Sequence, residues 1–191
     1  MTVKDLIKTT ATILQLDAIL SSGYFTMSTV KLTTEEDKQL QELLASLNMV
    51  NNIIATEYIP LLAETTCTVT NGKINYTSID RNRAILNIKK VRSTDGTVLT
   101  FTCYPTYLKT EGSQVVVTYA YYPATLTETD NVTTYGIQLS DRVYAYGMAA
   151  EYCFINGMYD EASMWDKRFK DALKGVTRRL AEVRLPGKVW A

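Results

Sequence analysis

Histidine is absent from this sequence of 191 residues. Because imidazole is the usual general base near neutral pH and the commonest metal ligand, its absence excludes most catalytic triads and histidine-bound metal sites. The nine glycines form neither a GxxxxGK[ST] nor a GxGxxG phosphate loop, and the sequence has no GxSxG elbow. We therefore expect a protein that is not an enzyme, with no catalytic residues, no cofactor and no bound metal.

Cysteine is scarce, and the three cysteines, Cys67, Cys103 and Cys153, stand far apart without a CxxC spacing. An odd number at such distances predicts neither a disulfide framework nor a zinc site. We expect reduced and mostly buried thiols in a cytoplasmic product. Cys153 has no general base beside it in the sequence, so a catalytic thiol is not expected.

The sequence also lacks an excess of charge of either sign, and it lacks long apolar runs. Twenty basic residues balance twenty acidic ones, so no global charge draws the chain onto nucleic acid or a membrane. No window approaches the roughly 18 apolar residues of a membrane-spanning helix. Residues 1–20 do not follow the pattern of a signal peptide. We expect a protein made in the cytoplasm that makes no membrane contact.

Apolar residues at helical spacing mark the N-terminal part of the chain. A stripe from Val3 to Leu20 predicts one helix, which ends at Gly23. A second helix follows, because Thr33 and Glu36 have the spacing of a capping box. Its apolar stripe continues for about six turns to Pro60, where proline ends it.

Helical spacing returns near the C-terminus. Ser140 is expected to cap a helix that ends at Asn156-Gly157, and another helix runs from about Asp160 to Pro186-Gly187. The small residues Gly147, Ala149 and Ala150 permit the close approach of a partner helix.

From Thr65 the apolar period changes to two, which predicts strands. Asn71-Gly72 favours a type I′ hairpin turn that pairs Thr70 with Lys73 and continues the ladder to Cys67 and Tyr76. A second hairpin is expected from residue 84 through Asp95-Gly96 to residue 104. A further strand spans residues 114–122 and ends at Pro123.

These elements predict an α+β fold. Its helical body has about four helices, two N-terminal and two C-terminal, with an inserted antiparallel β module of about five strands. The expected divisions are residues 1–64 for the N-terminal helices, 65–123 for the β insertion, and 124–191 for a linker loop, the C-terminal helical pair and a docking tail. Together they form one compact domain with an insertion.

Tyrosine is unusually frequent, with thirteen against four phenylalanines. Because tyrosine joins a large apolar ring to a polar tip, it suits surfaces that become interfaces. The alternative is that these rings pack inside the sheet and the helix pair. The candidates for contacts between subunits are Tyr119, Tyr121, Tyr122, Tyr135 and Tyr144.

The C-terminal section is locally basic. A candidate basic face comprises Lys167, Lys170, Lys174 and Arg178. Such a face is either simply solvated, with cations that complement the helix dipole, or in contact with an acidic partner or passing DNA. A tryptophan in a terminal tail indicates a segment that a partner covers. The expected docking residues are Arg184, Leu185, Pro186, Lys188, Val189 and Trp190.

A family resemblance rests on strings between residues 114 and 180. They are Val115-x-Val117-x-Tyr119-x-Tyr121-x-Pro123, then Leu126-Thr127, then Tyr146-Gly147-x-Ala149-Ala150-Glu151-Tyr152, and finally Gly157, Ala162, Trp165, Phe169 and Ala172-Leu173. This pattern resembles the head-to-tail connector proteins of tailed bacteriophages, the portal adaptors that include the tail tubular protein A-like group.

The resemblance implies a structural virion protein located in the neck, between capsid and tail. It implies a homo-oligomeric ring of about twelve subunits that surrounds a DNA channel without reading the DNA sequence. The C-terminal segment is expected to dock on the portal ring, and the opposite face to receive the next neck or tail protein. The alternatives are another neck or tail-completion protein, such as a stopper, and a ligand-binding module that uses the tyrosine-rich sheet.

Overall fold

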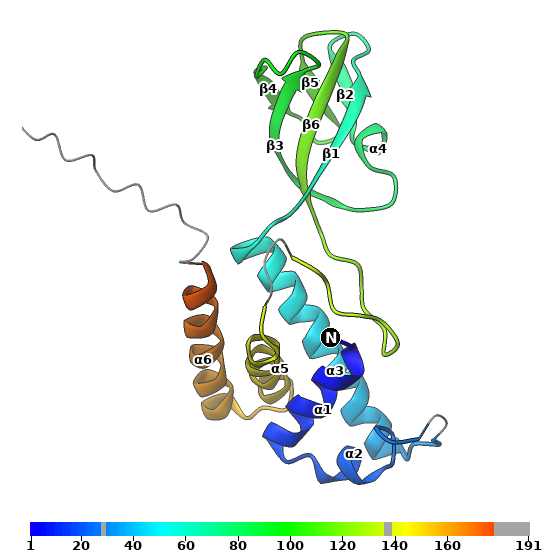
Figure 1. Cartoon of the computed structure of the whole chain (residues 1–191), viewed down its shortest axis with the longest axis vertical. Coiled ribbons are helices and arrows are strands. Elements are labelled where there is room, and N and C mark those ends of the chain that lie inside the picture. The colour runs from blue at the N-terminus through cyan, green and yellow to red at the C-terminus, as the bar shows by residue number, and fades with distance from the viewer. Residues whose placement is uncertain (28–29, 136–138, 178–191) are drawn as a thin grey trace, which may run out of the picture. The chain divides into compact units, whose positions relative to one another are not determined.

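The structure is a computed structural model that describes residues 1–27, 30–135 and 139–177. The chain divides into two compact units. The helical unit contains residues 1–50, 126–132 and 138–191, and the β unit contains residues 51–125 and 133–137 (Figure 1). Each unit is described separately.

The helical unit is built on long helices whose apolar faces meet in one core. Its described elements are α1 (Val3–Leu14), α2 (Asp17–Ser21), α3 (Thr34–Ile53, with its last residues in the β unit), α5 (Asp141–Ile155) and α6 (Tyr159–Thr177). The predicted capping box is confirmed, because the backbone N–H of Thr33 donates to Glu36 at 2.7 Å and the N–H of Glu36 donates to the Thr33 hydroxyl at 3.4 Å. No helix of the described residues is long and apolar enough to span a membrane.

The prediction of one continuous helix from Val3 to Leu20 is wrong. Gln15 adopts a left-handed backbone with φ of 55° and ends α1, and α2 then begins at Asp17. The N–H of Gln15 still donates to the carbonyls of the last turn, so the break leaves no orphaned donor. Ser140 does occupy the N-cap of α5, although its side chain makes no capping hydrogen bond.

Gly147 sets the packing of α5, as the small-residue pattern predicted. A Cβ atom at this position would lie 2.8 Å from Cγ2 of Val50 on α3 and 3.0 Å from the ring of Phe169 on α6. Real Cβ atoms do not come this close to other heavy atoms, so only glycine fits the present backbone. Three helices of the helical unit therefore converge on this residue.

The β unit contains two three-stranded antiparallel sheets. The first has the order β1 (Leu61–Thr68), β6 (Gln114–Tyr121), β3 (Ile85–Ser93), and the second the order β2 (Lys73–Asn75), β5 (Tyr107–Thr110), β4 (Phe101–Cys103). The short helix α4 (Tyr76–Ile79) follows β2, and a π-helical turn (Ile54–Tyr58) precedes β1. A buried cluster draws on both sheets and includes Val91, Leu108 and Val117. The two sheets thus share one apolar core.

The predicted fold class, α+β, is confirmed, but the strand count is corrected. The described residues form six strands in two sheets where about five were expected, and the first strand starts at Leu61 before the expected Thr65. Sequence reasoning missed β5, which follows Pro105. The N–H of Tyr104 donates to the carbonyl of Tyr107 at 2.9 Å, so the chain turns around this proline and pairs β4 with β5.

The Asn71-Gly72 turn is confirmed, whereas the ladder predicted beyond it is wrong. Both turn residues have positive φ, and Thr70 and Lys73 exchange two backbone hydrogen bonds of 3.0 Å. The strands then separate. Cys67 of β1 lies opposite Val115 of β6, while β2 pairs with β5. The turn therefore joins the two sheets instead of extending one hairpin.

Strand β3 forms an edge of the first sheet and is irregular. Its pairing with β6 shifts register between Ile85 and Asn87 and again between Ile88 and Lys90. Only the start of the second predicted hairpin is present, since Arg92 bridges Val98 after the Asp95-Gly96 turn and the chain then crosses to β4 in the other sheet.

Candidate functional site

A network centred on Asp80 joins the end of α4 to strand β6. The Asp80 carboxylate accepts hydrogen bonds from the backbone N–H groups of Asn82 and Arg83, from Nε of Arg83 at 2.7 Å and from the hydroxyl of Tyr119 at 2.7 Å. The Asp80 side chain is only 7% exposed. A nearly buried carboxylate with this many donors is held in one position.

Arg83 extends the network to the neighbouring tyrosines. Its Nη2 atom donates to the Tyr119 hydroxyl at 3.1 Å, and its guanidinium lies 4.0 Å from the centre of the Tyr121 ring. Tyr121 is half-buried, and its ring makes a cation–π contact with this guanidinium. The ionic pair and the two rings form one rigid cluster at the edge of the sheet core.

The hydrogen bond from Tyr119, together with those from Asn82 and Arg83, lowers the pKa of Asp80 to about 2. Burial raises the pKa of the Tyr119 hydroxyl, and its hydrogen bond to Asp80 adds to this effect. Asp80 is therefore a fixed anion and Tyr119 a neutral donor across the physiological range. Neither group is suited to exchange protons with a substrate near pH 7.

Acidification is expected to weaken the β unit through Asp80. Its pKa in the folded chain lies below the unfolded value of roughly 3.9, so the unfolded state binds more protons in this range. The stabilisation is complete above the unfolded pKa and is lost as the pH falls toward 2. Hydrogen exchange of the β6 and β3 amides at pH 5 and pH 2.5, corrected for the intrinsic exchange rate at each pH, measures the loss. Asp80→Asn should reduce this pH dependence in part, since the pKa of Asp95 in the same unit is also lowered, and an unchanged dependence would contradict the assignment.

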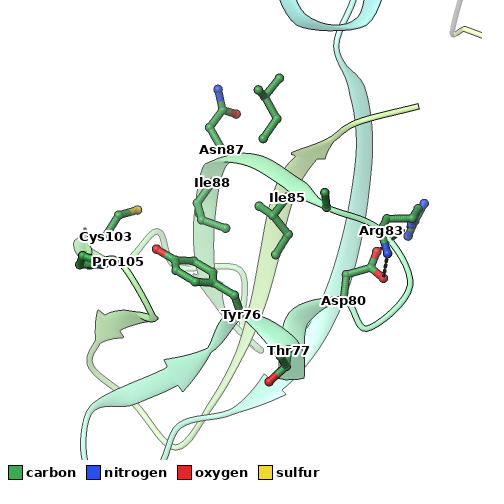
Figure 2. A pocket seen from close by; sticks show the side chains of 11 residues that line it. Tyr76, Thr77, Asp80, Arg83, Ile85, Asn87, Ile88, Cys103 and Pro105 are labelled. Atoms are coloured by element: carbon green, nitrogen blue, oxygen red, sulfur yellow. Dashed lines mark hydrogen bonds and ion pairs between the residues drawn. The ribbon is translucent and has the colours of Figure 1, made fainter. Parts of the chain in front are cut away.

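An open cleft of about 560 Å³ lies beside this network. Figure 2 shows Ile85 between Tyr76 and the Asp80–Arg83 pair, with Ile88 next to the ring of Tyr76. The cleft is lined by Tyr76, Thr77, Asp80, Arg83, Ala84, Ile85, Leu86, Asn87, Ile88, Cys103 and Pro105. Its wall is mainly apolar, and its polar groups stand at the rim.

The polar groups of the cleft are largely engaged with one another. The Tyr76 hydroxyl donates to the carbonyl of Tyr104 at 2.9 Å, and Asp80 is paired with Arg83. The exposed part of the Arg83 guanidinium is the cationic group at the rim. This arrangement suits the binding of an apolar body and contains no nucleophile paired with a general base.

A second candidate surface lies on helices α5 and α6. Large apolar side chains are exposed where α5 ends and α6 begins, with Phe154 exposed by 63% and Tyr159 by 65%. Their rings meet edge to face at 5.8 Å between centroids. We call the exposed residues Phe154, Ile155, Tyr159 and Met164 the α5–α6 patch.

A shallow pocket of about 450 Å³ adjoins the α5–α6 patch and is lined by acidic groups as well as by aromatic rings. Glu151 and Asp166 both line it. Burial, and secondarily the charge of Asp166, raise the pKa of Glu151. Asp166 pairs with Lys170 at 2.7 Å, whereas Glu151 has no hydrogen bond or ion pair within residues 1–27, 30–135 and 139–177. Among the described residues, Glu151 is thus a half-buried carboxylate without a cation.

The five tyrosines proposed for subunit contacts separate into two groups. Tyr119, Tyr135 and Tyr144 are buried in the chain itself, so their rings serve the core and are not accessible to a neighbour. Tyr121 is half-buried and in contact with Arg83, and Tyr122 is exposed. The alternative of intrachain packing therefore explains the buried three.

The predicted basic face is partly neutralised by acids on its own helix. Lys167, Lys170 and Lys174 are all exposed, but Lys170 pairs with Asp166 and Lys174 lies 3.8 Å from Asp171. Arg178 lies outside the described residues. So do the expected docking residues Arg184, Leu185, Pro186, Lys188, Val189 and Trp190.

The three cysteines are free thiols, with Cys67 and Cys153 buried as expected and Cys103 exposed. Burial, with a contribution from Glu161, raises the pKa of Cys153 to about 11, so the thiol stays protonated near neutrality. In the part of the chain that the structure describes, no group of three or more acidic or thiol side chains is arranged to hold a metal ion.

Sequence reasoning missed both the Asp80–Arg83 pair and the α5–α6 patch. A local signal for the first exists, since an aspartate whose side chain binds the N–H groups two and three residues later is a common turn motif. The patch has no local signal, because only the packing of α6 against α5 decides which apolar residues stay outside. The chain matches no model of a known protein family, and no curated protein is a significant match to it.

Proposed function

We propose that this chain is a structural subunit of a tailed bacteriophage, an adaptor that forms a ring between the portal vertex and the tail. The observation that carries the proposal is the α5–α6 patch. A helical unit that buries its other large apolar residues with few exceptions leaves Phe154, Ile155, Tyr159 and Met164 exposed along one helix pair. Phe154 and Tyr159 meet edge to face, and exposed aromatic rings that lie together are typical of a surface that another protein covers.

The arrangement of elements supports the same proposal. The segments that resemble connector proteins correspond to β6, α5 and α6, and one of their small residues, Gly147, lies where α5 closely approaches α3 and α6. The resemblance therefore concerns the scaffold of the chain. The docking tail is a separate part of the proposal and depends on the composition of residues 184–190.

Assembly on a template explains how such subunits would stay apart until they are needed. Contacts between neighbouring subunits are individually weak, but a portal ring presents many equivalent sites and raises their effective concentration. Side-to-side contacts close into a ring when the rotation per subunit divides the circle. The exposed Tyr122 and the α5–α6 patch are the surfaces that such contacts would use. DNA crosses the ring without sequence-specific recognition, and the far face receives the next neck protein.

Mass photometry of the chain mixed with purified portal rings tests the proposal. We expect stepwise addition that saturates at about one copy per portal subunit. Deleting residues 186–191 should abolish this addition while circular dichroism shows an unchanged fold. A full-length chain that does not add to the portal, or a truncated chain that adds normally, would overturn the adaptor or its docking tail respectively.

A second candidate function, a ligand-binding module, is favoured by the cleft of about 560 Å³ beside Arg83. Asn87 is exposed and lines this cleft, so Asn87→Trp would fill it without altering the core. If the chain is a ligand-binding module, small carboxylic acids with an apolar body should raise the melting temperature of the native chain but not that of this variant. An adaptor would add to the portal ring unchanged.

A further inference from the structure

The helical unit and the C-terminal segment of the chain carry opposite charges. The described residues of the helical unit contain 14 Asp and Glu against nine Lys and Arg. Residues 178–191 contain four basic residues, Arg178, Arg179, Arg184 and Lys188, against the single acid Glu182. Electrostatic attraction therefore favours contact between this segment and the helical unit.

The segment also matches the α5–α6 patch in detail. Its apolar residues, Leu180, Val183, Leu185, Val189 and Trp190, alternate with its cations. The patch offers exposed aromatic rings, and beside them stands the carboxylate of Glu151, which is half-buried and has no cation among the described residues. A basic segment with apolar residues supplies an apolar cover for the rings and a cation for Glu151.

The length of the segment permits this contact within one chain. Helix α6 runs from Tyr159 to Thr177, a rise of roughly 27 Å. The following 14 residues, 178–191, span up to about 46 Å when extended, which is enough to return to the start of α6. A tethered segment also has a far higher effective concentration than a second copy in dilute solution.

We propose that, in the free chain, residues 178–191 fold back over the α5–α6 patch of the same chain and place a cation beside Glu151. The contact covers Trp190 and the Phe154–Tyr159 pair together. It does not depend on the proposed adaptor function, since the test uses the chain alone. If the chain is an adaptor, the same contact holds the docking tail closed until a portal competes for it.

Quenching of Trp190 fluorescence by acrylamide tests the proposal. A Trp165→Phe background leaves Trp190 as the only tryptophan, and a peptide of residues 178–191 supplies the exposed reference. We expect quenching roughly threefold weaker in the chain than in the peptide, as for a closed population of about two-thirds. Phe154→Ser with Tyr159→Ser should restore quenching to the peptide's level.

Val98→Ser is the matched control, because Val98 is exposed by 61%, much as Phe154 is, and belongs to the β unit. It should leave the quenching unchanged. Equal quenching of chain and peptide would overturn the proposal, as would protection that survives the patch substitutions. Protection that rises over a roughly hundredfold increase in protein concentration would assign the contact to a second copy and overturn the same-chain form.

Trypsin cleavage after Arg184 and Lys188 gives a second measurement on the chain with Trp165 intact. The double substitution in the patch should speed cleavage about threefold when opening is fast relative to cleavage. Val98→Ser should have no effect. Identical rates in the native chain and the patch variant would contradict the proposed contact whatever the fluorescence shows.

Discussion

Gly147→Leu is expected to destabilise the helical unit by about 3 kcal/mol. Even a Cβ atom would lie within 3.0 Å of Val50 and Phe169, so a leucine side chain must displace two buried neighbours. The loss far exceeds the gain of about 1 kcal/mol that a helix obtains when glycine is replaced by a good helix former. Urea unfolding in a Trp190→Phe background, followed by the fluorescence of Trp165, which stacks on Tyr146 of α5, measures the free energy of unfolding of this unit.

Gly175→Leu is the control for Gly147→Leu, because it is also a helical glycine and a Cβ atom there meets nothing within 4 Å. It should be neutral or stabilise the unit by up to about 1 kcal/mol. Val50→Ala should relieve the clash, so Gly147→Leu and Val50→Ala together should cost at least about 1 kcal/mol less than their sum. Equal effects at the two glycines would show that close packing at Gly147 is not what excludes a side chain.

Asp80→Ala is expected to destabilise the β unit by about 2–4 kcal/mol. The substitution removes the acceptor of four hydrogen bonds and leaves the Tyr119 hydroxyl and the Arg83 guanidinium without their anion. The β unit contains no tryptophan, so hydrogen exchange of the β6 and β3 amides is the suitable measurement. Protection of both strands should fall together, because Tyr119 belongs to the core between the sheets.

Asp95→Ala provides the comparison for Asp80→Ala. Asp95 also accepts a backbone hydrogen bond, from Thr97 at 2.8 Å, but it does so in an exposed turn. Its loss should leave the protection of β6 and β3 nearly unchanged, because water replaces the missing partner. If both variants weaken β6 and β3 equally, the network around Asp80 has no special part in holding the unit together.

Local chemistry made the helices and one turn predictable from sequence. The capping pair Thr33 and Glu36, and the positive φ that Asn71-Gly72 accepts, act through neighbours a few residues apart. The close helix approach at Gly147 followed from its small size in the same way. These features depend on interactions within a few residues and so can be recognised in the sequence.

The remaining features depend on contacts between distant residues. Cys67 was expected to face Tyr76 across a hairpin, but β6 takes this position, and a local pattern cannot specify a partner nearly fifty residues away. Tyrosines 119, 135 and 144 have side chains that suit a core and an interface equally, so composition alone could not place them. Asp80 and Arg83 form a network only because both hydrogen-bond to the hydroxyl of Tyr119, which lies on the distant strand β6.

The irregular edge formed by β3 has a consequence for the contacts that this chain can make with other molecules. An open strand edge invites hydrogen bonding with the strand of another molecule, and repeated pairing of this kind ends in fibres. The two register shifts of β3 break the even row of donors and acceptors, and Lys89 and Lys90 bring like charges together when two such edges meet. The β3 edge is therefore poorly suited to pairing with the same strand of a second molecule.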